Sequence, residues 1–116
     1  MATISDFIDP SKVQIRDERV TQGEAIVLFL KPNVEMEKAL LVVINDLIKF
    51  LSKTTGRMYE QQREPYSNSY RICEPGHKSY GLKVIPHADK ILIQSIAVLF
   101  DIDILRQYVQ RLRRMV

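Results

Sequence analysis

Residues 25–56, which read AIVLFLKPNVEMEKALLVVINDLIKFLSKTTG, decide the fold of this chain. The first six are all apolar and rich in β-branched and aromatic side chains, and six residues are too few for a free-standing helix. A uniform apolar run of this length predicts a strand that is buried on both faces. Pro32 and Asn33 end the strand.

A long amphipathic helix is expected after this strand, with Asn33 as its N-cap and Gly56 as its C-terminal stop. Glutamates in its first turn and lysines in its last turn match the helix dipole. Apolar residues recur along it at spacings of three and four, which predicts one broad face packed against a sheet. That face consists of Met36, Leu40, Val43, Ile44, Leu47, Ile48 and Leu51.

Shorter elements are expected around this strand–helix unit. Residues 12–16 alternate in a way that suits an edge strand, and residues 21–23 suit a turn. Between residues 57 and 86, tyrosines stand among polar residues, prolines and glycines, a pattern typical of short strands in a meander. The strands expected in that meander are 57–61, 69–73 and 80–85.

The stretch 88–100 permits two interpretations. Its apolar residues at spacings of three and four suit a helix, whereas Ile91 and Ile93 and the β-branched content suit a strand. We favour the helix. Asp101 is then placed to cap a last helix over 102–115.

The composition is that of one globular domain, with 116 residues, of which 46% are hydrophobic and 27% charged. No repeat, low-complexity tract or interior linker divides the chain. We therefore expect an N-terminal arm over 1–11 and a single α+β domain over 12–116. The predicted class is α+β: a small domain with a central buried strand, a long amphipathic helix, a short antiparallel meander and one or two C-terminal helices.

Cysteine content and apolar runs bear on the compartment. Cys73 is the sole cysteine, so an internal disulfide is excluded and a reducing, cytoplasmic location is expected. The first ten residues hold two aspartates and lack the basic region of a signal peptide. The longest apolar runs fall far short of the roughly 20 residues of a membrane span, so no membrane partner is expected.

The net charge of +3 is unevenly distributed along the chain. Residues 1–56 hold seven Lys or Arg against eight Asp or Glu, a net of −1. Residues 57–116 hold ten against six, a net of +4. Because residues 104–116 contain four arginines and no acid, the basic character is a local property of the C-terminus.

The C-terminal helix is the clearest functional signal in the sequence. On a helical projection one arc is apolar, made of Leu105, Tyr108, Val109, Leu112 and Met115. The opposite face holds the candidate partner-binding residues Arg106, Gln107, Gln110, Arg111, Arg113 and Arg114. Arginine binds carboxylate or phosphate bidentately and stays charged, so this face is predicted to dock an acidic partner. A structural explanation stands beside it, since the same arginines complement the helix dipole and solvate an exposed face.

Nucleic-acid binding is suggested by two weaker patterns. If 88–100 is helical, it forms with 102–115 the outline of a helix-turn-helix, although the connecting turn is short and lacks glycine. Tyrosines between basic residues in the meander are candidates for stacking on bases, namely Tyr59, Tyr66, Tyr70 and Tyr80. Glutamates in that segment lower its charge to +2, and tyrosines are also ordinary residues of half-buried strands.

Catalytic and metal-binding patterns are sparse. Cys73, His77 and His87 are the only soft ligands, one fewer than a structural zinc site normally needs. A Cys–His pair oriented by Asp89 is the catalytic alternative. The four glycines match no phosphate-binding loop. We therefore expect no cofactor, no metal and no enzymatic activity.

The function predicted from the sequence is that of a non-enzymatic interaction module. Such a small regulator, adaptor or assembly subunit would act through protein–protein contacts and self-association, with the basic C-terminal helix as its docking surface. The alternative is a nucleic-acid-binding protein that uses the C-terminal arginine face and the strands bearing tyrosine and arginine. A third hypothesis is a small enzyme or ligand-binding protein built on the cysteine and the two histidines.

Overall fold

The structure is a computed structural model that describes residues 3–20, 23–65, 68–76, 81–95 and 102–115. Two short 3-10 helices come first and are followed by a strand hairpin, a long helix, four further strands and a last helix. In chain order they are η1 (Ile4–Asp6), η2 (Pro10–Lys12), β1 (Gln14–Val20), β2 (Gly23–Leu30), α1 (Met36–Thr55), β3 (Glu60–Arg63), β4 (Tyr70–Cys73), β5 (Leu82–His87), β6 (Lys90–Ser95) and α2 (Ile102–Arg113).

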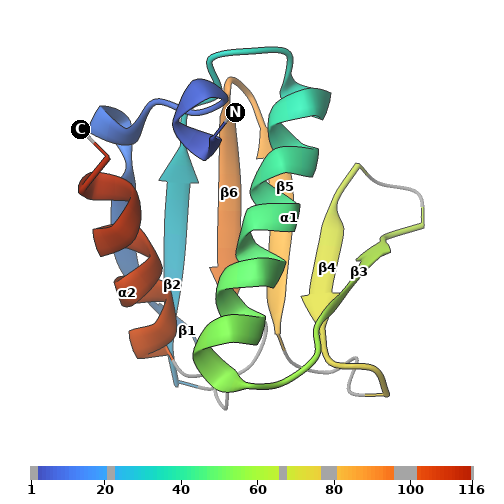
Figure 1. The fold of residues 1–116 in the computed structure, drawn as a ribbon. Helices are drawn as coiled ribbons and strands as arrows, with labels where there is room; N and C mark the ends of the chain where they lie inside the picture. Colours follow the sequence, from blue (N-terminus) through green and yellow to red (C-terminus); the bar gives the residue numbers. More distant parts are fainter. Residues whose placement is uncertain (1–2, 21–22, 66–67, 77–80, 96–101, 116) are drawn as a thin grey trace.

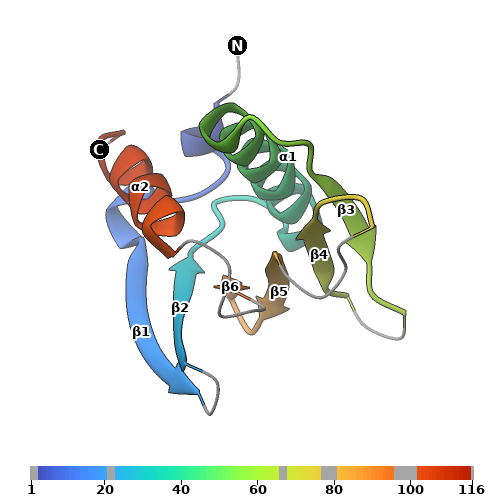
Figure 2. The same ribbon diagram turned by 90° about the horizontal axis from the view of Figure 1, so that it is seen from below.

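The strands form one six-stranded sheet in the order β1-β2-β6-β5-β4-β3, and every pairing is antiparallel. The last strand in the chain, β6, therefore lies between β2 and β5. Strands β6 and β5 are the two central strands of the sheet. Both helices pack on the same face of the sheet (Figures 1 and 2). The mixed α+β class expected from the sequence is thus confirmed.

The core lies between the helices and the sheet, as the pattern of residues 25–56 predicts. On α1 the buried residues include Leu40, Val43, Ile44, Leu47 and Leu51. Leu28 and Leu30 of β2 meet them from the sheet, both fully buried. Each buried leucine or isoleucine contributes about 1.5–3 kcal/mol of transfer free energy, so this layer supplies most of the cohesion.

One end of α1 agrees with the sequence and the other does not. Gly56 has φ 71°, a left-handed conformation, and its N–H donates to the carbonyl of Ser52, so the predicted C-terminal stop is confirmed. The prediction of Asn33 as N-cap is wrong, because the helix begins at Met36 and Glu35 occupies the N-cap position. The backbone N–H of Asn33 instead donates to the carbonyl of Phe7 at 2.8 Å.

The N-terminal segment, expected as an arm, packs into the domain. Ile4 and Ile8 are buried in the core, and Ile8 forms an isolated β-bridge with Pro32. The N–H of Asp9 donates to the carbonyl of Lys31 at 2.8 Å. The segment is therefore fastened to the connection between β2 and α1.

The helix favoured over 88–100 is wrong within the described residues, since Lys90–Ser95 is strand β6. Its side chains alternate: Ile91, Ile93 and Ser95 are buried, while Leu92 and Gln94 are half-buried. Pairing with β2 and β5 on both sides satisfies its backbone, which decides between the two patterns that the sequence allowed. The helix-turn-helix outline is excluded with it, and Asp101 lies outside the described residues.

The meander is present, with shifted boundaries. The observed strands cover 60–63, 70–73 and 82–87 instead of 57–61, 69–73 and 80–85. Gly81 precedes the last of them with φ 138°, and a Cβ there would lie 2.1 Å from the carbonyl oxygen of Ile72. Only glycine permits that close approach of two strands. In the turn expected over 21–23, Gly23 begins β2 and the other two residues lie outside the described part.

Strand register divides the side chains of the sheet between two faces. The face toward the helices carries the buried apolar residues of the sheet: Leu28, Leu30, Ile72, Leu82, Val84, Ile91 and Ile93. The opposite face has no described helix over it (Figure 2). One row of residues crosses all six strands on that open face: Arg16, Val27, Gln94, Lys83, Arg71 and Gln62.

Candidate functional site

The last helix, α2, carries the docking residues predicted from the sequence. Its inner side is buried through Leu105, Tyr108, Val109 and Leu112, and Met115 packs partly against the same core. This confirms the predicted apolar arc. Of the six predicted docking residues, Arg111 is half-buried. The other five are exposed, namely Arg106, Gln107, Gln110, Arg113 and Arg114.

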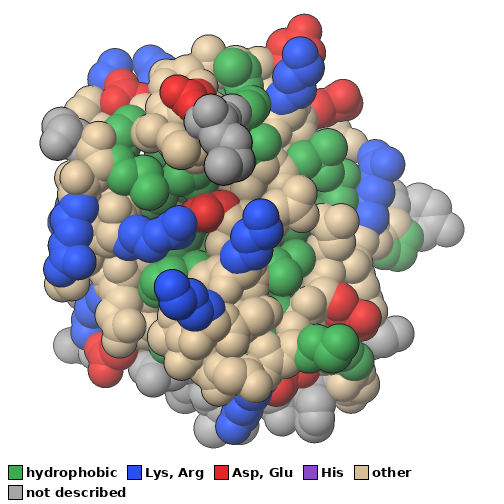
Figure 3. Space-filling view, viewed as in Figure 1, with side chains coloured by type: hydrophobic (Ala, Val, Ile, Leu, Met, Phe, Trp, Pro, Cys, Tyr) green, Lys and Arg blue, Asp and Glu red, His purple; other side chains and the backbone are tan. Residues whose placement is uncertain are grey.

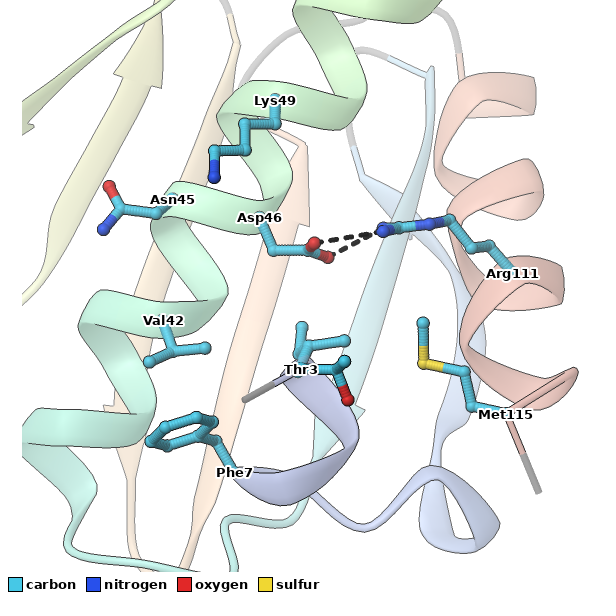
Figure 4. A pocket seen from close by; sticks show the side chains of 9 residues that line it. Thr3, Phe7, Val42, Asn45, Asp46, Lys49, Arg111 and Met115 are labelled. Carbon is cyan, nitrogen blue, oxygen red and sulfur yellow. Dashed lines mark hydrogen bonds and ion pairs between the residues drawn. The ribbon is translucent and has the colours of Figure 1, made fainter. Parts of the chain in front are cut away.

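A carboxylate of α1 anchors the inner side of α2. Asp46 accepts a hydrogen bond from the hydroxyl of Tyr108 at 2.7 Å. It also accepts two from the Arg111 guanidinium, at 2.8 Å to Oδ2 and 3.2 Å to Oδ1. Figure 4 shows the guanidinium reaching across from α2 to this carboxylate. The ring of Phe50 completes the cluster, 5.2 Å from the ring of Tyr108 and 5.8 Å from the Arg111 guanidinium carbon.

The protonation states in this anchor are fixed by its surroundings. Burial raises the pKa of Tyr108 well above its ordinary value, and the charge of Asp46 and the hydrogen bond to it act in the same direction. The hydrogen bond to Asp46 likewise raises the pKa of Arg111. Tyr108 therefore remains a hydrogen-bond donor and Arg111 remains charged, so α2 is held against α1 in one orientation.

The anchor changes the predicted row of outward arginines. Arg111 turns toward α1 and its charge is neutralised by Asp46, so it does not belong to the outward row. Arg106 lies 3.3 Å from Asp103 on its own helix, and Arg113 donates to the carbonyl of Val13 over a long 3.4 Å. Within the described part of the chain, the side chain of Arg114 makes no hydrogen bond or ion pair.

A pocket of about 470 Å³ opens beside the anchor, between α1, α2 and the N-terminal segment (Figure 4). Its walls combine apolar and polar side chains: Thr3, Ile4, Phe7, Val42, Asn45, Asp46, Lys49, Arg111 and Met115. The carboxylate in it is already engaged by three hydrogen bonds, and the Thr3 hydroxyl lies 2.7 Å from that of Ser5. The anchor thus engages the carboxylate that lines this pocket.

The tyrosines predicted to stack on bases have structural partners where they are described. Tyr59 and Tyr70 are half-buried and pack against the core. Tyr70 pairs with Val84 across β4 and β5, which places it on the helix side of the sheet. Tyr66 and Tyr80 lie outside the described residues.

The cysteine and histidines are not brought together as a described cluster. Cys73 is fully buried and forms no disulfide, whereas His87 is exposed at the end of β5. His77 lies outside the described residues. Among the residues that the structure describes, no group of three or more His, Cys, Asp or Glu side chains could hold a metal ion.

Asp46 is the residue that sequence reasoning missed. It flanks the apolar stripe of α1, and its position in the sequence does not distinguish it from an ordinary acid on the surface of a helix. The signal that pointed to it lies on the other helix: Tyr108 falls in the apolar arc, and a buried tyrosine hydroxyl needs a hydrogen-bond partner. An acid near the edge of the neighbouring apolar stripe is the natural acceptor.

No described helix is both long and apolar enough to cross a bilayer. Comparison with models of known protein families, with curated proteins and with solved structures finds no match.

Proposed function

We propose that the protein is a non-enzymatic interaction module, a small regulator, adaptor or assembly subunit that docks an acidic protein partner on the outer face of α2. The observation that carries this proposal is an exposed polar face on a helix whose other side is buried and anchored. That outer face consists of Arg106, Gln107, Gln110, Arg113 and Arg114.

Rigid presentation is what favours docking over mere solvation. The hydrogen bonds to Asp46 and the buried inner face hold α2 in place, so a partner does not have to order the helix when it binds. Ordering a flexible element consumes part of the gross interaction energy, and a pre-formed surface avoids that loss. Lys and Arg side chains lie over and beside α2 in the view of Figure 3.

The spacing of the outer residues suits extended or helical acidic segments. Arg106, Gln110 and Arg113 follow one another at intervals of four and three, so they form one line along the helix, and Gln107 and Arg114 lie seven apart on a neighbouring line. Guanidinium groups bind carboxylates through two parallel hydrogen bonds, which gives orientation as well as attraction. A partner that presents carboxylates about two helical turns apart would match Arg106 and Arg113.

The test neutralises two exposed arginines together. We expect the double substitution Arg113→Gln and Arg114→Gln to weaken binding of a fluorescein-labelled peptide of about ten glutamates by about tenfold, measured by fluorescence anisotropy at low salt. The matched control is Lys38→Gln with Lys53→Gln, which removes the same charge from exposed positions of α1. Equal weakening by both pairs, or none by the α2 pair, would contradict the proposal.

Nucleic-acid binding through the arginine face is the second candidate function. The acid-free sequence from Ile104 onward favours it, because phosphates and carboxylates attract the same guanidinium groups. The two described stacking candidates, Tyr59 and Tyr70, pack against the core, which weakens the case for base stacking beside these arginines. A single-stranded oligonucleotide tested on the same variants separates the two, since a peptide-specific loss supports protein docking.

A further inference from the structure

The open face of the sheet carries a second basic surface, away from the helices. The row that crosses the six strands contains the cations Arg16, Lys83 and Arg71 and the amides Gln94 and Gln62, with no acid. Arg71 is paired with Glu64 at 3.0 Å, so the charge is compensated toward β3. Among the described side chains, the uncompensated part of the row lies over β1, β6 and β5.

Phe29 lies in the next row of the same face. It is half-buried and pairs in register with Gln14 on one side and Leu92 on the other. Two cations lie over its ring: the guanidinium carbon of Arg16 is 5.1 Å from the ring centroid, and Nζ of Lys90 is 5.9 Å from it. The open face thus combines an aromatic ring with positive charge and neutral amides.

A pocket of about 330 Å³ continues this surface at the end of β1, β2 and β6. Three lysines from separate parts of the chain line it, and one of them, Lys90, is the lysine that lies over Phe29. The lining consists of Ser11, Lys12, Val13, Gln14, Lys31, Asp89 and Lys90. The hydroxyl of Ser11 donates to Asp9, so the three lysines and the amide of Gln14 are the groups suited to an anionic oxygen group.

Two acids lie near the pocket without cancelling its charge. Asp89 lines it, and Asp9 lies 4.0 Å from Lys12. Hydrogen bonds from Ser11 lower the pKa of Asp9, and the nearby lysines lower it further, so this acid is ionised at neutral pH. Against these two acids the pocket sets three lysines, and Arg16 and Lys83 add positive charge on the adjoining sheet face.

We propose that this surface binds single-stranded nucleic acid, with a phosphate in the lysine pocket and a base against Phe29. Lys90 both lines the pocket and lies over the ring of Phe29, so one nucleic-acid strand could contact the pocket and the ring together. Cations that hold the backbone beside an aromatic ring that stacks a base are the two parts of a single-strand site. Gln14 and Gln94 lie beside them with donors and acceptors for base edges.

Single strands fit this surface better than an acidic protein or a duplex. An acidic peptide would satisfy the lysines, but a run of carboxylates offers no aromatic base to stack on the ring of Phe29. A duplex stacks its bases inside the helix, where a ring on a sheet surface does not reach them. The occupant that uses every part of the site is therefore an unpaired strand.

The experiment measures binding of a fluorescein-labelled twelve-nucleotide oligo(dT) by anisotropy at several KCl concentrations. We expect Lys31→Gln with Lys90→Gln to weaken binding about tenfold at low salt. The slope of log K against log salt should become shallower by about 1.4, which is about 0.7 for each lost phosphate contact on a single strand. Phe29→Leu should weaken binding about fivefold with the slope unchanged, because it removes stacking and no charge.

Matched variants keep this result distinct from docking on α2. The pair Lys38→Gln and Lys53→Gln should leave oligonucleotide binding unchanged, as should Arg113→Gln with Arg114→Gln. A loss with the α2 pair would move the nucleic acid to the arginine face and overturn this site. If a pocket variant fails to fold, Arg16→Gln at an exposed position provides a second measurement of how much positive charge contributes to oligonucleotide binding.

Three outcomes would overturn the proposal. One is salt-insensitive or undetectable oligonucleotide binding. Another is a duplex of the same length that binds as tightly as the single strand. The third is a decaglutamate peptide that binds as tightly and loses affinity with the same lysine variants, which would make the surface a protein-docking site.

Discussion

The two faces of the sheet are built from alternate residues of the same strands, and they differ in burial. In β6, Ile91 and Ile93 point to the helices and are fully buried, whereas Leu92 and Gln94 point to the open face and are half-buried. In β2, Leu28 and Phe29 divide in the same way. Cohesion therefore comes mainly from the covered face, although Val27 of the open-face row is also buried.

The largest expected effect tests that division directly. Ile93→Ala removes a fully buried side chain from the covered face and should lower the free energy of unfolding by about 3–4 kcal/mol. Leu92→Ala, one residue away on the open face, should cost about 1 kcal/mol because its environment is already partly solvent. Urea unfolding followed by circular dichroism measures both.

If Leu92→Ala lowered the free energy of unfolding as much as Ile93→Ala, the proposed difference between the two faces would be wrong. It would mean that the open face is covered in solution, for example by a second copy of the chain. Repeating the unfolding at two protein concentrations identifies that case, since the stability of an associated form rises with concentration.

A smaller effect is expected at the anchor of α2 on the covered side. Asp46→Ala leaves the buried hydroxyl of Tyr108 without its acceptor and should lower the free energy of unfolding by about 2–3 kcal/mol. We place the value below that for a fully buried pair because the Arg111 side chain is 40% exposed. Asp46→Asn keeps an oxygen acceptor and should cost less. A loss below about 0.5 kcal/mol in both variants would show that apolar packing alone holds α2.

The smallest expected effect is a pH dependence carried by Tyr108. Its pKa is raised in the folded protein, so its contribution to stability is complete below pH 10 and is lost as the unfolded chain ionises above that pH. Tyr108→Phe should cost about 1 kcal/mol at pH 8. The difference between the two proteins should shrink by about 1 kcal/mol by pH 11, because only the wild type loses this contribution. A difference that stays constant with pH would place the hydroxyl in contact with water.

The sequence revealed those parts of the fold in which one pattern outweighs the others. The stripe on α1, its stop at Gly56 and the apolar arc of α2 follow from helical spacing and are confirmed. Strand β6 was missed because its apolar residues fit two periods, and only pairing with β2 and β5 decides between them. Its hairpin with β5 also lacks the usual turn glycine: the turn residue Ala88 has φ 53°, a conformation that a sequence without glycine does not suggest.

The candidate surfaces were accessible to sequence reasoning to different degrees. Helical projection is enough to separate the two sides of α2, so its outer residues could be named in advance. The turn of Arg111 toward Asp46 depends on where another helix lies. Lys12, Lys31 and Lys90 are far apart in the chain, and no spacing rule brings them to one pocket. Phe29 was read only as part of a buried strand, because an all-apolar run does not show which face lies open.

The N-terminal segment lines two pockets, the one beside Asp46 and the lysine pocket at the edge of the sheet. Thr3, Ile4 and Phe7 form a wall of the pocket beside Asp46, while Ser11, Lys12 and Val13 form a wall of the lysine pocket. Hydrogen bonds to Lys31 and Asn33 fasten the stretch between these walls. This short segment links the walls of the two pockets. An insertion or a bulky label near Asp9 would therefore disturb both pockets at once.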